Sequence, residues 1–243
     1  MKALFRIGLR MTGIGLGALL CITSCSIDND PYDAVFTLEP FDTLTLNSVF
    51  EVVLQQGDHF GIEISGVKEI AGSVTYQIVN RTLWIENEDG ALWKHPELDP
   101  PLLTITFNTL SKINAYETCH IISADTIRMD SLGLTLGSKL NTVDLQVDCH
   151  LFYYWNSAPV GGEIIISGRT DYARFYNGSL MVIRAENLIA HDALVANGSA
   201  SDIHVHADQR LYYSITGIGD IYLQGNPPSI EAGLITSTGK LIQ

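Results

Sequence analysis

The chain has 243 residues and a formal net charge of −13, with 27 acidic side chains against 14 lysines and arginines. This acidic excess disfavours nucleic acid and anionic membrane surfaces as partners, because both carry the same sign of charge. The hydrophobic fraction of 46% is enough for a substantial core, in one domain or in two small ones.

Residues 1–24 have the features of a secretory signal peptide. Three positive charges within the first ten residues precede an apolar run that ends at Ile22, and this run is too short to cross about 30 Å of hydrocarbon. It leads into Ile-Thr-Ser-Cys, which resembles the bacterial lipoprotein box and indicates that Cys25 is acylated. Acyl chains on Cys25, palmitate among them, predict a stable membrane anchor without a spanning helix.

Residues 25–35 form a short, polar and acidic segment, which predicts a tether. An acidic stretch directly after the lipidated cysteine resembles the signal that displays Bacteroidetes lipoproteins on the outer face of the outer membrane. A plain solvated linker is the alternative. We therefore expect an outer membrane lipoprotein whose folded part lies on the periplasmic or the cell-surface side.

From residue 36 onward the chain has the alternation of β-strands and no sustained helical period. Alternating apolar residues occupy 103–107, 132–136 and 143–147, and glycine, asparagine, aspartate and serine separate such runs. Residues 86–101 interrupt the pattern, which resumes at Leu102. The sequence therefore predicts one all-β domain over residues 36–243.

Turn-like triplets recur about every 20 residues in the second half of the chain. They end at Ser138, Ser157, Ser179, Ser199, Ile218 and Gly239. This period, with alternating apolar residues before each turn, predicts that each repeat is one coil of a β-solenoid with its turns stacked in one column. An ordinary antiparallel meander is the alternative.

Aligning the repeats on these turns predicts which aromatic side chains face solvent. If the leucines of 132–136 point inward, the alignment places Phe152 and Tyr154 outside, with Tyr176 beside Tyr154 on the next rung. Because rungs are about 4.8 Å apart, these three side chains are candidate ligand-binding residues that could stack on sugar rings or on an apolar partner. A ladder that only stabilises the sheet is the alternative.

Other polar constellations favour no catalytic, metal or cofactor site. The possible carboxylates and arginines of a polysaccharide-cleaving enzyme are Glu163, Arg169, Asp171 and Arg174, and the possible zinc ligands are His191, His204, His206 and Asp208. Neither set has the spacing of an established site, so solvated outer-face side chains are the preferred interpretation. Cys119 and Cys149 lie one and a half predicted rungs apart, which favours two buried free thiols over a disulfide.

Three short motifs resemble the Asp-Ser/Thr-apolar signal for O-glycosylation of exported Bacteroidetes proteins. They make Thr43, Thr126 and Ser131 candidate modification sites. Chance matches are the alternative, since the motif is short.

Ordered motifs along the chain resemble the head GIN domain family of Bacteroidetes lipoproteins, described as putative auto-transporter adhesins. They lie at residues 41–44, 49–58, 62–66, 82–85 and 216–227. The resemblance implies a right-handed parallel β-helix-like solenoid with a more irregular N-terminal β portion, and it supplies no catalytic residues. We therefore expect a non-enzymatic envelope protein, an adhesin-like binding or scaffold module for a glycan or envelope protein. A carbohydrate-active enzyme on the same scaffold, a lyase or a hydrolase, is the alternative.

Overall fold

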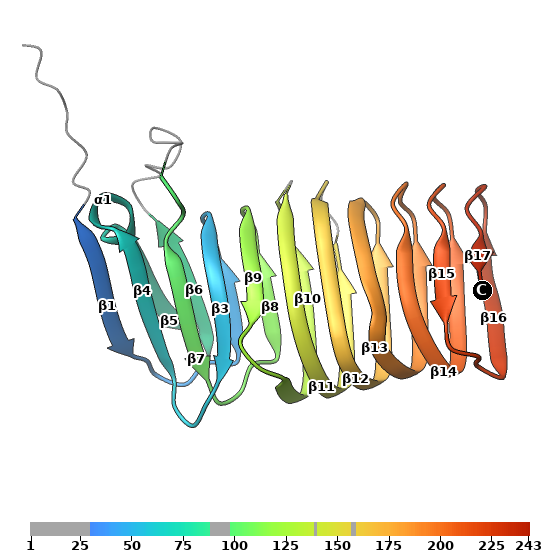
Figure 1. The fold of residues 1–243 in the computed structure, drawn as a ribbon, viewed down its shortest axis with the longest axis horizontal. Coiled ribbons are helices and arrows are strands. Elements are labelled where there is room, and N and C mark those ends of the chain that lie inside the picture. Colours follow the sequence, from blue (N-terminus) through green and yellow to red (C-terminus); the bar gives the residue numbers. More distant parts are fainter. Residues whose placement is uncertain (1–29, 88–97, 139, 157–158) are drawn as a thin grey trace, which may run out of the picture.

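The computed structural model describes residues 30–87, 98–138, 140–156 and 159–243, and these are almost entirely β-strand (Figure 1). The all-β prediction is therefore confirmed. The signal peptide and Cys25 lie outside the described residues. Within them, no helix has the length and apolar character needed to span a membrane.

The N-terminal part contains short strands and one helical turn. These are β1 (Pro31–Thr37), β2 (Thr43–Leu46), β3 (Phe50–Gln56), β4 (Gly61–Val67), α1 (Lys68–Ala71), β5 (Val74–Val79), β6 (Thr82–Asn87), β7 (Leu102–Phe107), β8 (Lys112–Ala115) and β9 (Cys119–Ser123). The C-terminal part contains β10 (Ile127–Leu136), β11 (Asn141–Trp155), β12 (Gly161–Asn177), β13 (Leu180–Asn197), β14 (Ile203–Ile215), β15 (Ile221–Gln224), β16 (Ser229–Ile235) and β17 (Leu241–Ile242).

The long strands β11 to β14 each run along two walls of a flattened solenoid. The first half of β11 pairs with β9 and its second half pairs with β10, both in parallel. Figure 1 shows these ribbons curving from one wall to the other at a bend. The solenoid has about 6 turns, so the predicted architecture is confirmed.

We call the two layers wall A and wall B. Wall A contains, in spatial order, β1, β4, β7, β3, β9, the first halves of β11 to β14, β15 and β17. Wall B contains β5, β6, β2, β8, β10, the second halves of β11 to β14 and β16. Alternate residues of each strand point into the space between the walls, where the alternating apolar residues of 132–136 in β10 and 143–147 in β11 are fully buried.

The N-terminal part departs from the regular coil. The strands β2 and β3 insert between β6 and β7 on one side and β8 and β9 on the other. Beyond them β1, β4 and β5 pair antiparallel and form the N-terminal end of the sheet. This confirms the irregular N-terminal portion. The strand β1 begins at Pro31, within the range 25–35 that the sequence assigned to a tether.

The predicted column of turns is present. The amide of Gly198 donates to the Asn177 carbonyl (2.8 Å), and that of Gly219 donates to the Ser199 carbonyl (3.0 Å). Earlier in the column, the hydroxyls of Thr118 and Ser138 are 3.1 Å apart. These turns are thus hydrogen-bonded to their neighbours on the adjacent rung. The predicted turn residue Ser157 lies outside the described residues.

A buried asparagine connects three of these turns. Asn177 donates through Nδ2 to the Met181 carbonyl (2.7 Å) and to Ser199 Oγ (3.1 Å), and its Oδ1 accepts from Asn156 (3.4 Å). Because the side chain is excluded from water, these partners replace the hydrogen bonds that solvent would provide. Asparagine is therefore needed at this position for the hydrogen bonds of its side-chain amide, not for the volume of its side chain.

We expect Asn177→Ala to lower the free energy of unfolding by about 2 kcal/mol, because it leaves buried partners without a hydrogen bond. Urea unfolding followed by circular dichroism measures the change. The control is Asn187→Ala, at an exposed position, where the change should stay within about 0.5 kcal/mol. Equal stability of the two variants would contradict this role.

Candidate ligand-binding face

The outer face of wall B carries most of the exposed aromatic side chains of the second half of the chain. Trp155 and Tyr176 are register partners on β11 and β12, and their side chains are 51% and 50% exposed. Tyr172 and Tyr212 are also exposed, on β12 and β14. The rings thus lie on one face, on the adjacent rungs β11 and β12 and on β14, which β13 separates from β12.

Two glycines let aromatic rings lie close against this face. A Cβ added to Gly133 would come within 2.0 Å of Cζ of Tyr153, its register partner on β11. A Cβ added to Gly233 would come within 2.3 Å of the Tyr212 hydroxyl. Both rings therefore extend over the adjacent strand, where any larger residue would displace them.

A shallow groove follows the second half of β13. The outward residues there, Leu194 and Ala196, are shorter than the aromatic and arginine side chains on β12 and β14. Two hollows of about 260 and 320 Å³ lie end to end in the groove. The first is lined by Tyr172, Arg174, Asp192, Leu194, Arg210 and Tyr212, and the second by Tyr176, Ala196, Ser214 and Leu234 with the adjacent turns.

One ion pair crosses the floor of the first hollow. Arg210 Nη2 lies 2.6 Å from Asp192 Oδ2, and this hydrogen bond raises the pKa of the Arg210 guanidinium. His191 Nδ1 lies 3.3 Å from the other oxygen of Asp192. The Asp192 charge is therefore compensated by groups of its own chain.

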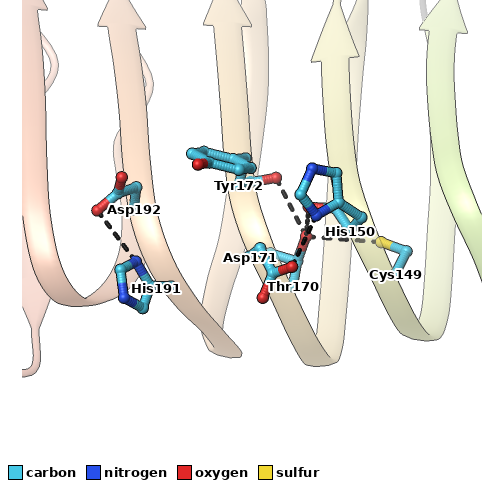
Figure 2. Close-up of polar contacts among 7 residues, drawn as sticks. All are labelled: Cys149, His150, Thr170, Asp171, Tyr172, His191 and Asp192. Atoms are coloured by element: carbon cyan, nitrogen blue, oxygen red, sulfur yellow. Dashed lines mark hydrogen bonds and ion pairs between the residues drawn. The ribbon is translucent and has the colours of Figure 1, made fainter.

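A polar cluster on the bend borders the groove (Figure 2). His150 Nδ1 lies 2.7 Å from Asp171 Oδ2 on the next rung, and its ring meets that of Tyr172 edge-on at 5.1 Å. The Thr170 hydroxyl is within hydrogen-bonding distance of the Tyr172 carbonyl (3.1 Å) and the Cys149 thiol (3.6 Å). These contacts fix the bend and hold the position of Tyr172.

The predicted aromatic ladder is wrong for two of its three members. Phe152 and Tyr154 are 0% and 1% exposed and lie in the core, whereas Tyr176 is on the outer face as predicted. The alignment paired Leu132 with Leu151, but the structure pairs Leu132 with Phe152. A shift of one residue exchanges the two faces of a strand.

On the outer face of wall B, residues that the sequence prediction missed take the place of Phe152 and Tyr154. Trp155, Tyr172 and Tyr212 are exposed there, and Tyr153 lies over Gly133. Once the register is known, the glycine on the neighbouring rung is the signal that could have identified Tyr153.

The structure does not bring together the side chains that the sequence offered for a polysaccharide-cleaving enzyme. Glu163 lies on wall A, where it pairs with Arg184, whereas Asp171 lies on the bend and pairs with His150. Arg174 lies on the outer face of wall B. The described residues thus hold these two carboxylates apart instead of placing both in one cleft.

The histidines and the aspartate that the sequence offered as zinc ligands also do not converge on one site. His204 stacks on Tyr222 with ring centroids 4.5 Å apart, His206 lies 3.1 Å from Asp208, and His191 pairs with Asp192. Within the described ranges, no group of three or more histidine, cysteine or acidic side chains could hold a metal ion.

The candidate glycosylation sites differ in their surroundings. Thr43 lies in β2, where its hydroxyl donates to Asp42 Oδ1 (3.2 Å), and Ser131 lies within β10. Thr126 lies between β9 and β10, outside the strands. Modification at all three stays a prediction.

These features define a parallel β-solenoid with an aromatic outer face, and comparison with known proteins gives its family. The chain belongs to the family described as "Putative auto-transporter adhesin, head GIN domain", which matches residues 40–227. Membership indicates a protein of the cell envelope or cell surface. No curated protein matches the chain.

Solved structures share the fold at low sequence identity. A putative adhesin from Bacteroides fragilis is 17% identical, with a TM-score of 0.78 over 88% of this chain and 97% of its own. A putative lipid binding protein from Parabacteroides distasonis is 14% identical, with a TM-score of 0.62 over 89% and 98%. A putative adhesin from Parabacteroides distasonis is 13% identical, with a TM-score of 0.61 over the same shares.

Within the described residues, Cys119 and Cys149 are free and buried. Burial raises the pKa of the Cys119 thiol to about 12 and also raises that of Cys149, because the thiolate loses its hydration. Both thiols should therefore be inert in the folded protein.

We expect iodoacetamide at pH 8 to leave Cys119 and Cys149 unmodified in the native full chain and to alkylate both in denaturant. Peptide mass mapping resolves the two positions, and the denatured sample is the control. A disulfide-linked peptide, or rapid native alkylation, would contradict the free and buried state.

Proposed function

We propose that this protein is a non-enzymatic, lipid-anchored binding module of the cell envelope that recognises a glycan through the outer face of wall B. The observation that carries the proposal is a set of exposed rings on one face: Trp155, Tyr172 and Tyr176 on the adjacent rungs β11 and β12, and Tyr212 on β14, across β13. Flat aromatic faces stack well on the apolar faces of sugar rings. The adhesin descriptions of the family and of its structural neighbours support the same class of function.

The groove gives these rings a defined ligand path. Tyr172 and Tyr176 border one side and Tyr212 borders the other, with Leu194 and Ala196 between them. Polar groups lie between the apolar surfaces, as in sites that orient a ligand by a few hydrogen bonds. An extended chain of sugar units fits this open shape.

Attachment to the membrane is the second part of the proposal. The lipoprotein box at Cys25 and the apolar presequence support an acyl anchor. With β1 beginning at Pro31, only residues 26–30 separate the lipid from the folded part. The solenoid would therefore be held near the membrane by its N-terminal end.

We expect a Cys25→Ala variant to leave the membrane fraction after carbonate washing, because the acyl chains supply the only anchor in this proposal. Immunoblotting of pellet and supernatant measures the partition, and Cys149→Ala is the control that should stay in the pellet. Quantitative retention of Cys25→Ala would contradict lipid anchoring.

We expect the double variant Tyr176→Ala, Tyr212→Ala to bind saccharides on a glycan array at least tenfold more weakly than the unmodified chain, since it removes two stacking surfaces. Thermal unfolding should change little, because both rings are exposed. The matched control is Tyr116→Ala, an exposed ring outside the groove. Undiminished binding by the double variant would contradict the proposed face, and binding of no saccharide by the unmodified chain would contradict the glycan ligand.

A further inference from the structure

The arginines of this chain differ in whether a carboxylate accompanies them. Arg81 pairs with Asp42 at 2.7 Å and Arg210 with Asp192 at 2.6 Å. Arg184 pairs with Glu163, and Arg128 lies 3.9 Å from Asp148. Across the described ranges, Arg169 and Arg174 are the two arginines whose side chains have neither an ion pair nor a hydrogen bond.

Arg174 is the one of these two that lies in the groove. It is exposed on the outer face of β12, between Tyr172 and Tyr176, and it lines the first hollow. Its register partners on the adjacent rungs are Tyr153 and Leu194, neither of which carries a charge. A free guanidinium is thus placed among rings.

The acidic residues of the hollow leave this charge uncompensated. Asp192 is already paired with Arg210 at 2.6 Å. Glu231 lies across the groove, since the register runs from Arg174 through Leu194 and Tyr212 to Glu231, a distance of about 14 Å at the usual strand spacing. On a chain of net charge −13, the β12 side of this groove therefore carries a positive charge with no carboxylate partner.

The chemistry of guanidinium identifies the group that would pair with it. Its planar fork donates two parallel hydrogen bonds to a carboxylate, which adds direction as well as charge. A carboxylate carried on a sugar ring would bring an apolar ring face to Tyr176 while reaching Arg174. Uronic acids combine these two features in one unit.

We propose that the groove binds a linear saccharide containing uronic acids, which lies along β13 with sugar rings against Tyr176 and Tyr212 and a carboxylate at Arg174. This inference rests on the proposed function and names its ligand class. The two hollows lie end to end, and Tyr172 and Tyr176 are about 13 Å apart along the strand at the usual rise per residue. An oligomer of a few sugar units covers that length.

Other occupants fit the groove less well. A folded protein partner needs about 800 Å² per side with few charges at its centre, whereas three charged side chains, Arg174, Asp192 and Arg210, line the first hollow. A lipid chain needs an enclosed apolar cavity, whereas these hollows are open and buried side chains fill the space between the walls.

The test is calorimetric titration of the full chain with hexamers of galacturonate, mannuronate and hyaluronan, each compared with its carboxyl-reduced counterpart. We expect at least one uronate hexamer to bind about tenfold more tightly than its neutral counterpart at about 50 mM salt, with the difference shrinking as salt rises. Arg174→Gln should remove this preference, so that the uronate hexamer and its neutral counterpart bind with about equal affinity. The matched control is Arg169→Gln, which should retain the preference.

The outcomes separate this inference from the proposed function. Equal affinity for charged and neutral hexamers, or a preference that survives Arg174→Gln, overturns the uronate assignment. If Tyr176→Ala still weakens binding in that case, the glycan-binding face stands. Failure of every hexamer, in a chain that binds another saccharide on the array through Tyr176 and Tyr212, also overturns the uronate assignment alone. Binding of no saccharide at all overturns both.

Discussion

Parallel, in-register pairing between successive rungs is the constraint on which this structure depends. From β10 to β14 almost the whole length of each strand pairs with the next, so the register of one rung determines that of its neighbour. Inward residues then stack on inward residues, and outward ones form columns. The core, the turn column and the outer faces are all consequences of this pairing.

The same pairing explains why buried polar residues are tolerated at the turns. Asn156, Asn177 and Asn197 recur at equivalent places, and each satisfies backbone or side-chain groups of its own or the next turn. A buried amide without such partners would destabilise the fold. Repetition supplies the partners, because these three successive turns present the same groups to one another.

The sequence predicted the architecture well, because the turn period and the alternation in segments such as 132–136 follow directly from rung geometry. It could not assign the faces of the block 152–155, since four consecutive aromatic residues show no apolar alternation. The register then depended on turn alignment, which erred by one residue. The register shifts between β12 and β13 and between β13 and β14 were not predicted from the sequence either.

Separation of the two faces also explains how one fold could carry different sites. Replacing an outward residue such as Leu194 or Ala196 leaves the inward set, and hence the core, unchanged. Here a rung of short side chains between two rungs of rings creates the groove. Structures only 14 to 17% identical keep the same fold, which is expected if the pairing and the inward residues carry the stability. The chemistry of each outer face must therefore be determined from that chain's own residues.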